Sequence, residues 1–85
     1  MRAAVLEQPG PVTNLHLREL PLPAPAEGWV RIRVHAAGLN RSELHTRLGL
    51  AGDAVTLPRV LGIEATGVVD ADPSGRHDPG TQVAT

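Results

Sequence analysis

Residues 30–44 read VRIRVHAAGLNRSEL and change their hydrophobic spacing halfway along. Over residues 29–37, apolar and polar side chains alternate, which predicts a strand with one face in the core and one in solvent. Beyond this strand the spacing lengthens, because Leu44 and Leu48 lie four residues apart and Gly49 follows as a stop signal. The stretch therefore predicts a strand that runs through a loop into a short helix. The predicted core face of the strand comprises Val30, Ile32, Val34 and Ala36.

The segments on either side also favour short strands. A proline-rich turn lies between two predicted strands, at residues 2–6 and 15–20. Prolines at every second position of residues 21–25 predict an extended segment that crosses between strands without pairing. Residues 60–70 are mostly apolar and predict a strand with two internal glycines, which allow another backbone to approach closely. Residues 81–85 begin a last strand whose partner is not evident, so we expect the chain to continue beyond it.

The composition favours one small domain with an aliphatic core. The 85 residues include no cysteine and a single aromatic residue, Trp29, which excludes a disulfide framework and a core of stacked rings. The net charge is −1 and the arginines are scattered, which argues against a nucleic-acid surface. There is no signal-peptide pattern and no apolar run near the ~20 residues of a membrane helix. We expect a soluble, cytoplasmic protein that binds neither nucleic acid nor membrane.

The loop after the central strand concentrates groups that carry chemistry. Asn40, Ser42, Glu43 and His45 supply an amide, a hydroxyl, a carboxylate and an imidazole, at a place where rigid scaffolds often hold ligands. A structural alternative is a capped helix, with Ser42 on the first-turn amides and with Asn40 and Glu43 as turn and dipole residues. The residues by themselves leave both interpretations open.

Glu64 interrupts an otherwise apolar stretch. Because an unpaired buried carboxylate is costly, we expect it to face solvent or to pair with Arg41, Arg47 or Arg59 as a structural strut, and direct catalytic use is a third interpretation. The four histidines have no metal-site spacing, and the chain has no glycine-rich phosphate loop. The residues therefore predict neither a zinc site nor a dinucleotide cradle within this chain.

Four stretches taken together are typical of a known family. Residues 30–44, the Arg-Leu-Gly of residues 47–49, PRVLGIEATGVV at residues 58–69 and GTQVA at residues 80–84 resemble the N-terminal GroES-like lobe of the medium-chain dehydrogenase/reductase superfamily. The resemblance implies a mainly β fold: a GroES-like, partly open β-barrel lobe with one short helix, truncated on its C-terminal side. Residues 1–85 would be the N-terminal part of the catalytic lobe, and the Rossmann domain that holds NADPH would lie outside this chain.

The same resemblance separates two branches of the superfamily. Zinc alcohol dehydrogenases have a ligand Cys and a ligand His where this chain has Asn40 and Ile63. An amide and an aliphatic side chain do not replace thiolate and imidazole on zinc, and the pattern resembles the zinc-free quinone oxidoreductase branch. That resemblance implies catalytic roles for Asn40 and Glu43 and NADPH contacts for Asn40 and His45, although His45 replaces a frequent Tyr. Supporting structural roles fall to Glu64, Ser42 and Arg47.

These implications lead to one expected function and two alternatives. We expect the front part of a zinc-independent, NADPH-dependent reductase of quinones or other activated carbonyls or enones. The whole enzyme would act on a small molecule and form a homodimer, and the 85-residue chain would not be active alone because nothing in it holds a dinucleotide. The alternatives are an enoyl reductase or polyketide-synthase reductase module, and a non-catalytic, stand-alone structural or interaction domain.

Overall fold

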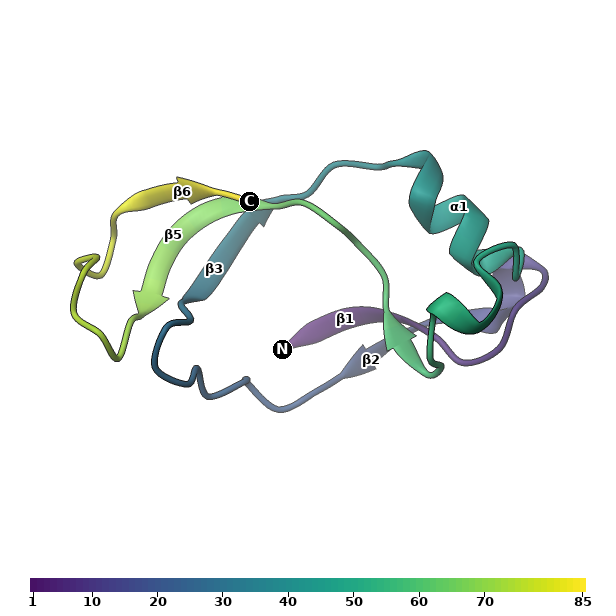
Figure 1. The fold of residues 1–85 in the computed structure, drawn as a ribbon, viewed down its shortest axis with the longest axis horizontal. Coiled ribbons are helices and arrows are strands. Elements are labelled where there is room, and N and C mark those ends of the chain that lie inside the picture. Colours follow the sequence, from purple (N-terminus) through teal and green to yellow (C-terminus); the bar gives the residue numbers. More distant parts are fainter. The chain divides into compact units, whose positions relative to one another are not determined.

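The computed structural model describes residues 1–85, which divide into two compact units. Unit 1 comprises residues 1–21 and 39–63, and unit 2 comprises residues 22–38 and 64–85. Each unit contains one three-stranded antiparallel sheet (Figure 1). The only α-helix is seven residues long, and no helix has the length and apolar character that crossing a membrane requires.

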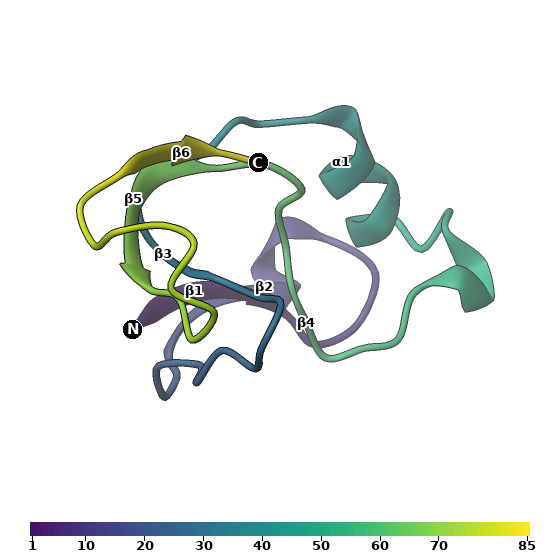
Figure 2. The ribbon, with the colours of Figure 1, turned by 60° about the vertical axis from the view of Figure 1, so that its left-hand side comes forward.

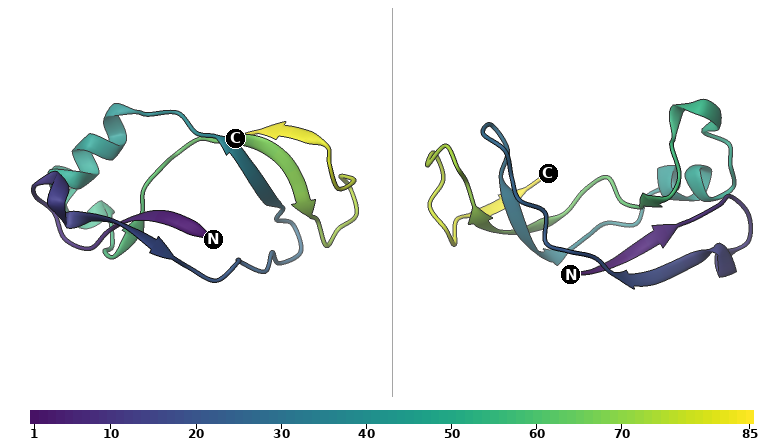
Figure 3. Two further views of the ribbon diagram at one scale, coloured as in Figure 1. Left: turned by 180° about the vertical axis from the view of Figure 1, so that it is seen from behind. Right: turned by 90° about the horizontal axis from the view of Figure 1, so that it is seen from below.

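Unit 1 is organised around its first strand. β1 lies between β2 and β4 and is antiparallel to both, as Figure 3 shows for β1 and β2. Ala3, Val5 and Leu6 of β1 are buried, and Leu6 is completely so, which makes this strand the core of the unit. The elements are β1 (Arg2–Leu6), the 3₁₀ turn η1 (Val12–Asn14), β2 (Leu15–Glu19), α1 (Arg41–Arg47), the 3₁₀ turn η2 (Gly52–Ala54) and β4 (Arg59–Val60).

Unit 2 has β5 as its central strand. β5 (Thr66–Ala71) pairs with β3 (Arg31–Ala36) on one side and with β6 (Gln82–Ala84) on the other (Figure 2). Val69 of β5 is buried with 1% of its surface exposed. Across the first pair, the Arg31 guanidinium donates to the Asp70 carboxylate, with 2.7 Å between Nε and Oδ2. The pairing of β3 with β5, which are far apart in the sequence, therefore brings the ends of these two strands together.

The predicted fold class, mainly β with one short helix, is confirmed, and so are the strands at residues 2–6 and 15–20 and the helix before Gly49. Two details of the prediction for the central strand are wrong. It begins only at Arg31, and Val34, placed on the core face, is 56% exposed. Ile32 and Val34 pair in regular register with Val69 and Gly67 and so share one face of β3. Ile32 is half-buried and Val34 is exposed, so this face is covered only in part.

Two other predicted strands differ from the observed ones. Residues 60–70 are not one strand: β4 ends at Val60 and joins the sheet of unit 1, whereas β5 begins at Thr66 in unit 2. Gly62, with φ of 129°, lies in the break, a backbone conformation that favours glycine. The last strand does have a partner, because β6 pairs with β5 and the pairing extends to reciprocal backbone hydrogen bonds between Ala65 and Thr85.

The turn that connects β5 to β6 is organised by Asp72. The Asp72 side chain is 2% exposed and accepts four hydrogen bonds, two from Ser74 and two from His77, at 2.6–3.0 Å. The Ser74 hydroxyl, the His77 ring and their two backbone amides hold the pKa of the Asp72 carboxyl well below its usual range. The ionised carboxylate thus stabilises the turn.

This arrangement predicts a stability that falls in acid. The pKa of Asp72 is lower in the folded than in the unfolded chain. The ionised carboxylate therefore contributes fully to the free energy of unfolding above about pH 4 to 5, and this contribution is lost as the pH falls. We expect Asp72→Ala to lower the free energy of unfolding at pH 7 and to lower it progressively less toward pH 2, measured by urea unfolding across the pH series. Asp78→Ala is the control, because the Asp78 side chain has no hydrogen bond. If Asp72→Ala lowers the free energy of unfolding by the same amount at every pH, the stabilising role of the ionised Asp72 carboxylate is contradicted.

Candidate functional site

The start of α1 holds the residues that the sequence singled out. Asn40 is the N-cap residue with extended backbone, and it forms a capping box with Glu43. The backbone N–H of Asn40 donates to Glu43 Oε2 at 2.8 Å, and the Asn40 side chain faces the Glu43 backbone N–H. The prediction that Ser42 caps the helix is wrong, because the helix begins at Arg41 and Ser42 lies inside its first turn. The Ser42 hydroxyl lies 3.5 Å from Glu43 Oε2.

The oxygen and the nitrogen of the Asn40 side-chain amide have different surroundings. In a capping box the side-chain oxygen accepts from the backbone at the third helical position, so the oxygen of Asn40 faces the helix. Its amide nitrogen Nδ2 is buried and has no hydrogen-bond partner. A buried donor without a partner costs about 1–3 kcal/mol, so this nitrogen is suited to donate to an acceptor atom supplied from outside the chain.

The last turn of α1 carries His45 and Arg47. His45 is exposed, and its carbonyl oxygen accepts from the Leu50 backbone N–H at 2.9 Å. Arg47 is half-buried, and its guanidinium donates to the carbonyl oxygen of Gly10 at 2.6 Å. Within unit 1, therefore, Arg47 supports the helix through a backbone carbonyl, a partner that the sequence did not reveal.

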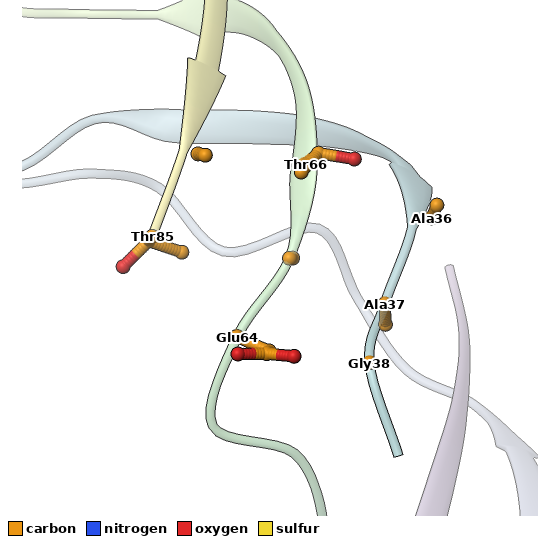
Figure 4. A pocket seen from close by; sticks show the side chains of 8 residues that line it. Ala36, Ala37, Gly38, Glu64, Thr66 and Thr85 are labelled. Atoms are coloured by element: carbon orange, nitrogen blue, oxygen red, sulfur yellow. The ribbon is translucent and has the colours of Figure 1, made fainter. Parts of the chain in front are cut away.

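Glu64 lies in unit 2, just before β5. Its side chain is exposed, it accepts no hydrogen bond from unit 2, and it points toward Gly38 (Figure 4). A Cβ atom at position 38 would overlap the Glu64 carboxylate, so a side chain there would displace the end of Glu64. Exposure agrees with the solvent-facing interpretation of Glu64. Pairing with Arg41, Arg47 or Arg59 stays a prediction, because these arginines belong to unit 1.

A cavity of about 380 Å³ opens beside Glu64 at the ends of the three strands of unit 2. Most of its walls are small side chains or backbone, and Glu64 supplies its one charged group. Sequence reasoning missed Gly38 and Thr66 as members of this cavity, and the absence of a side chain at Gly38 was the only signal. The lining residues are Ala36, Ala37, Gly38, Glu64, Ala65, Thr66, Ala84 and Thr85.

The structure thus groups Asn40, Ser42 and Glu43 at one helix end, His45 and Arg47 at the other, and Glu64 separately in unit 2. No group of three or more His, Asp or Glu side chains lies close enough to hold a metal ion. Independence from zinc nevertheless stays a prediction, which rests on the chemistry of Asn40 and Ile63.

Comparison with known proteins defines the class. Residues 26–85 match the family described as alcohol dehydrogenase GroES-like domain. The chain therefore belongs to this family, and the predicted resemblance is confirmed for the domain. The branch of the superfamily is not decided by this match.

Two relatives illustrate the range of this family. The mouse synaptic vesicle membrane protein VAT-1 homolog-like is 39% identical over 71 residues, which are 84% of this chain and 17% of that protein. A highly reducing polyketide synthase of Arthrinium phaeospermum is 39% identical over 66 residues, which are 75% of this chain and 3% of the synthase. This chain spans less than a quarter of either relative.

Solved structures show the same fold. An NAD-dependent alcohol dehydrogenase is 40% identical with a TM-score of 0.90, covering 99% of this chain and 25% of its own. A mycobacterial protein complexed with NADPH is 27% identical with a TM-score of 0.87, covering 100% of this chain and 27% of its own. The chain corresponds to about a quarter of each of these longer proteins.

Proposed function

We propose that residues 1–85 are the N-terminal part of the catalytic lobe of a zinc-independent, NADPH-dependent reductase of quinones or other activated carbonyls or enones. The observation that carries the proposal is the buried, unpartnered Nδ2 of Asn40. Membership of the alcohol dehydrogenase GroES-like family supports it, as does the likeness to a mycobacterial protein complexed with NADPH. The Rossmann domain would be supplied by the rest of a longer chain, and the whole enzyme would be a homodimer.

The residues at the start of α1 fit a nicotinamide and a carbonyl acceptor. When bound, NADPH supplies the hydride. Asn40 Nδ2 donates a hydrogen bond to an oxygen of the bound cofactor or acceptor and so stabilises negative charge that develops on a carbonyl oxygen. Glu43 fixes the orientation of Asn40 through its 2.8 Å bond to the Asn40 backbone N–H. His45, which is exposed in the last turn of the helix, would supply its imidazole as a further contact to the cofactor.

The choice of the zinc-free branch rests on ligand chemistry. Asn40 and Ile63 stand where zinc-dependent relatives have Cys and His. A carboxamide binds zinc poorly compared with thiolate, and an aliphatic side chain has no donor atom. Hydrogen bonding by Asn40 therefore takes the place of metal coordination in activating the carbonyl.

A second candidate function is a reductase module of a polyketide synthase. The match to the synthase of Arthrinium phaeospermum, over 75% of this chain, favours it. Such a module would reduce an enoyl thioester, which is also an activated carbonyl compound with a conjugated C=C bond, so the role of Asn40 would be the same. Activity on an enoyl thioester with no activity on free quinones would favour this candidate over the first.

The proposal is tested by removing the Asn40 donor while keeping the helix cap. Asn40→Asp retains a side-chain oxygen for the Glu43 N–H and removes the Nδ2 hydrogens. In the full-length protein we expect kcat/KM for NADPH-dependent quinone reduction to fall about 100-fold, the effect of losing one donor to a developing oxyanion. Steady-state kinetics with NADPH and with NADH, and metal analysis of the purified enzyme, provide the measurement.

Gln8→Glu is the matched control, because it makes the same amide-to-carboxylate change at an exposed position of unit 1. It should leave kcat/KM unchanged. Full activity of Asn40→Asp would disprove the role of Asn40, and a stoichiometric zinc ion required for turnover would disprove the proposed branch.

A further inference from the structure

A reciprocal pair of hydrogen bonds joins the end of α1 to the loop that follows β1. The Arg47 guanidinium donates to the Gly10 carbonyl oxygen at 2.6 Å, and the Gly10 backbone N–H donates to the Arg47 carbonyl oxygen at 2.7 Å. The two residues are 37 positions apart in the sequence. Figure 1 shows the end of α1 beside this loop. We call this pair the Arg47–Gly10 clamp.

The loop side of the clamp is itself held in place. The Asn14 side chain donates to the Pro9 carbonyl oxygen at 3.0 Å. Gly10 has φ of 133°, and a Cβ atom there would lie 2.9 Å from Asn14 Nδ2. On the helix side, Gly49 comes so close to Pro9 that an added Cβ atom would lie 3.1 Å from the Pro9 ring. The clamp therefore fixes α1 to a braced loop.

The helix has little else that fixes its position. α1 is seven residues long and contains no buried residue. Isolated helices of this length are not stable in water, so contacts at the two ends determine where the helix lies. The capping box of Asn40 and Glu43 is at the first end, and the Arg47–Gly10 clamp is at the second.

From this arrangement we infer that Arg47 is a positioning residue: by clamping α1 to the loop at Gly10 it sets the place and direction of the Asn40 amide at the opposite end of the helix. The inference rests on the proposed function, in which that amide contacts cofactor or acceptor. Arg47 acts through the helix and does not touch the reacting atoms.

The test combines Arg47 and Asn40 variants of the full-length protein with two kinds of measurement. The first is the side-chain amide signal of Asn40 in ¹⁵N NMR spectra of the ligand-free protein, identified by its loss in Asn40→Asp. The second is kcat/KM for NADPH-dependent reduction. We expect Arg47→Ala to shift the Asn40 signal and to lower kcat/KM about tenfold, because small displacements of catalytic groups cost one to two orders of magnitude.

Three further variants separate positioning from general stability. Arg47→Lys should restore both the signal and the rate, because an ammonium group can still donate to the Gly10 carbonyl oxygen. In the Asn40→Asp background, Arg47→Ala should lower kcat/KM by less than about twofold, since residues that act through one another are not additive. Arg59→Ala, an exposed arginine of unit 1, should change neither measurement.

An unchanged Asn40 signal in Arg47→Ala would overturn the inference, and so would losses of kcat/KM that multiply in the double variant. These outcomes are distinct from a failure of the proposed function. If the unaltered full-length protein does not reduce quinones or other activated carbonyls with NADPH, the proposed function is wrong, and if Asn40→Asp is fully active, the role of Asn40 in it is wrong. In both cases the NMR signal still reports directly whether Arg47 positions the amide.

Discussion

Gly67→Ala is expected to lower the free energy of unfolding by about 3 kcal/mol, the upper range for forcing an extra atom into a packed site. Gly67 is a buried residue of β5, and an added Cβ atom would overlap the carbonyl oxygen of Arg33 and lie 2.9 Å from its carbonyl carbon. Both are backbone atoms of the paired strand β3, so relief requires the two strands to separate. Urea unfolding followed by circular dichroism measures the loss.

Gly38→Ala is the matched control for this prediction. The added Cβ atom would also overlap another group, but that group is the exposed carboxylate of Glu64. Because the end of a flexible side chain can rotate away, we expect a loss below about 1 kcal/mol, within the range of surface substitutions. Equal losses from Gly67→Ala and Gly38→Ala would show that strand proximity is not the cause.

Leu6→Ala is expected to have an effect of similar size in unit 1. Leu6 is completely buried at the centre of the sheet, and truncation of a buried Leu typically costs 2–5 kcal/mol. Since a domain of this size has a small margin of stability, a large fraction of the variant should be unfolded at 37 °C. Amide hydrogen exchange of β1 and β2 measures this effect.

Leu17→Ala provides the comparison in the same sheet. Leu17 lies on β2 and is 69% exposed, so its truncation should change the free energy of unfolding by less than about 0.5 kcal/mol. A loss from Leu17→Ala as large as that from Leu6→Ala would contradict the assignment of the core to β1.

The sequence pattern was sufficient where local spacing determines structure. The short apolar run at residues 2–6 and the alternation at residues 15–20 predicted β1 and β2, and Gly49 marked the end of α1. The pattern was insufficient where pairing between distant segments determines the structure. The pairing of β6 with β5 depends on a chain reversal around Asp72, and the break after Val60 depends on the two halves joining different sheets.

The candidate site divides in the same way. The importance of Asn40 and Glu43 came from the resemblance to a family, and the structure adds the reciprocal cap between them. Ser42 was the wrong cap because serine and asparagine are equally good N-cap residues, and the choice depends on where the helix begins. The role of Arg47 could not be predicted, because its partner is a backbone carbonyl 37 residues away.

The central claim is that Asn40 contributes a hydrogen bond to the chemistry of an NADPH-dependent reductase. A crystal structure of the full-length protein with NADPH and an unreactive carbonyl analogue tests this claim most directly. We expect Asn40 Nδ2 to lie within about 2.7–3.2 Å of an oxygen of the nicotinamide or of the analogue, the range of an N–H···O hydrogen bond. A complex in which NADPH and the analogue are bound and Asn40 Nδ2 contacts neither would contradict it.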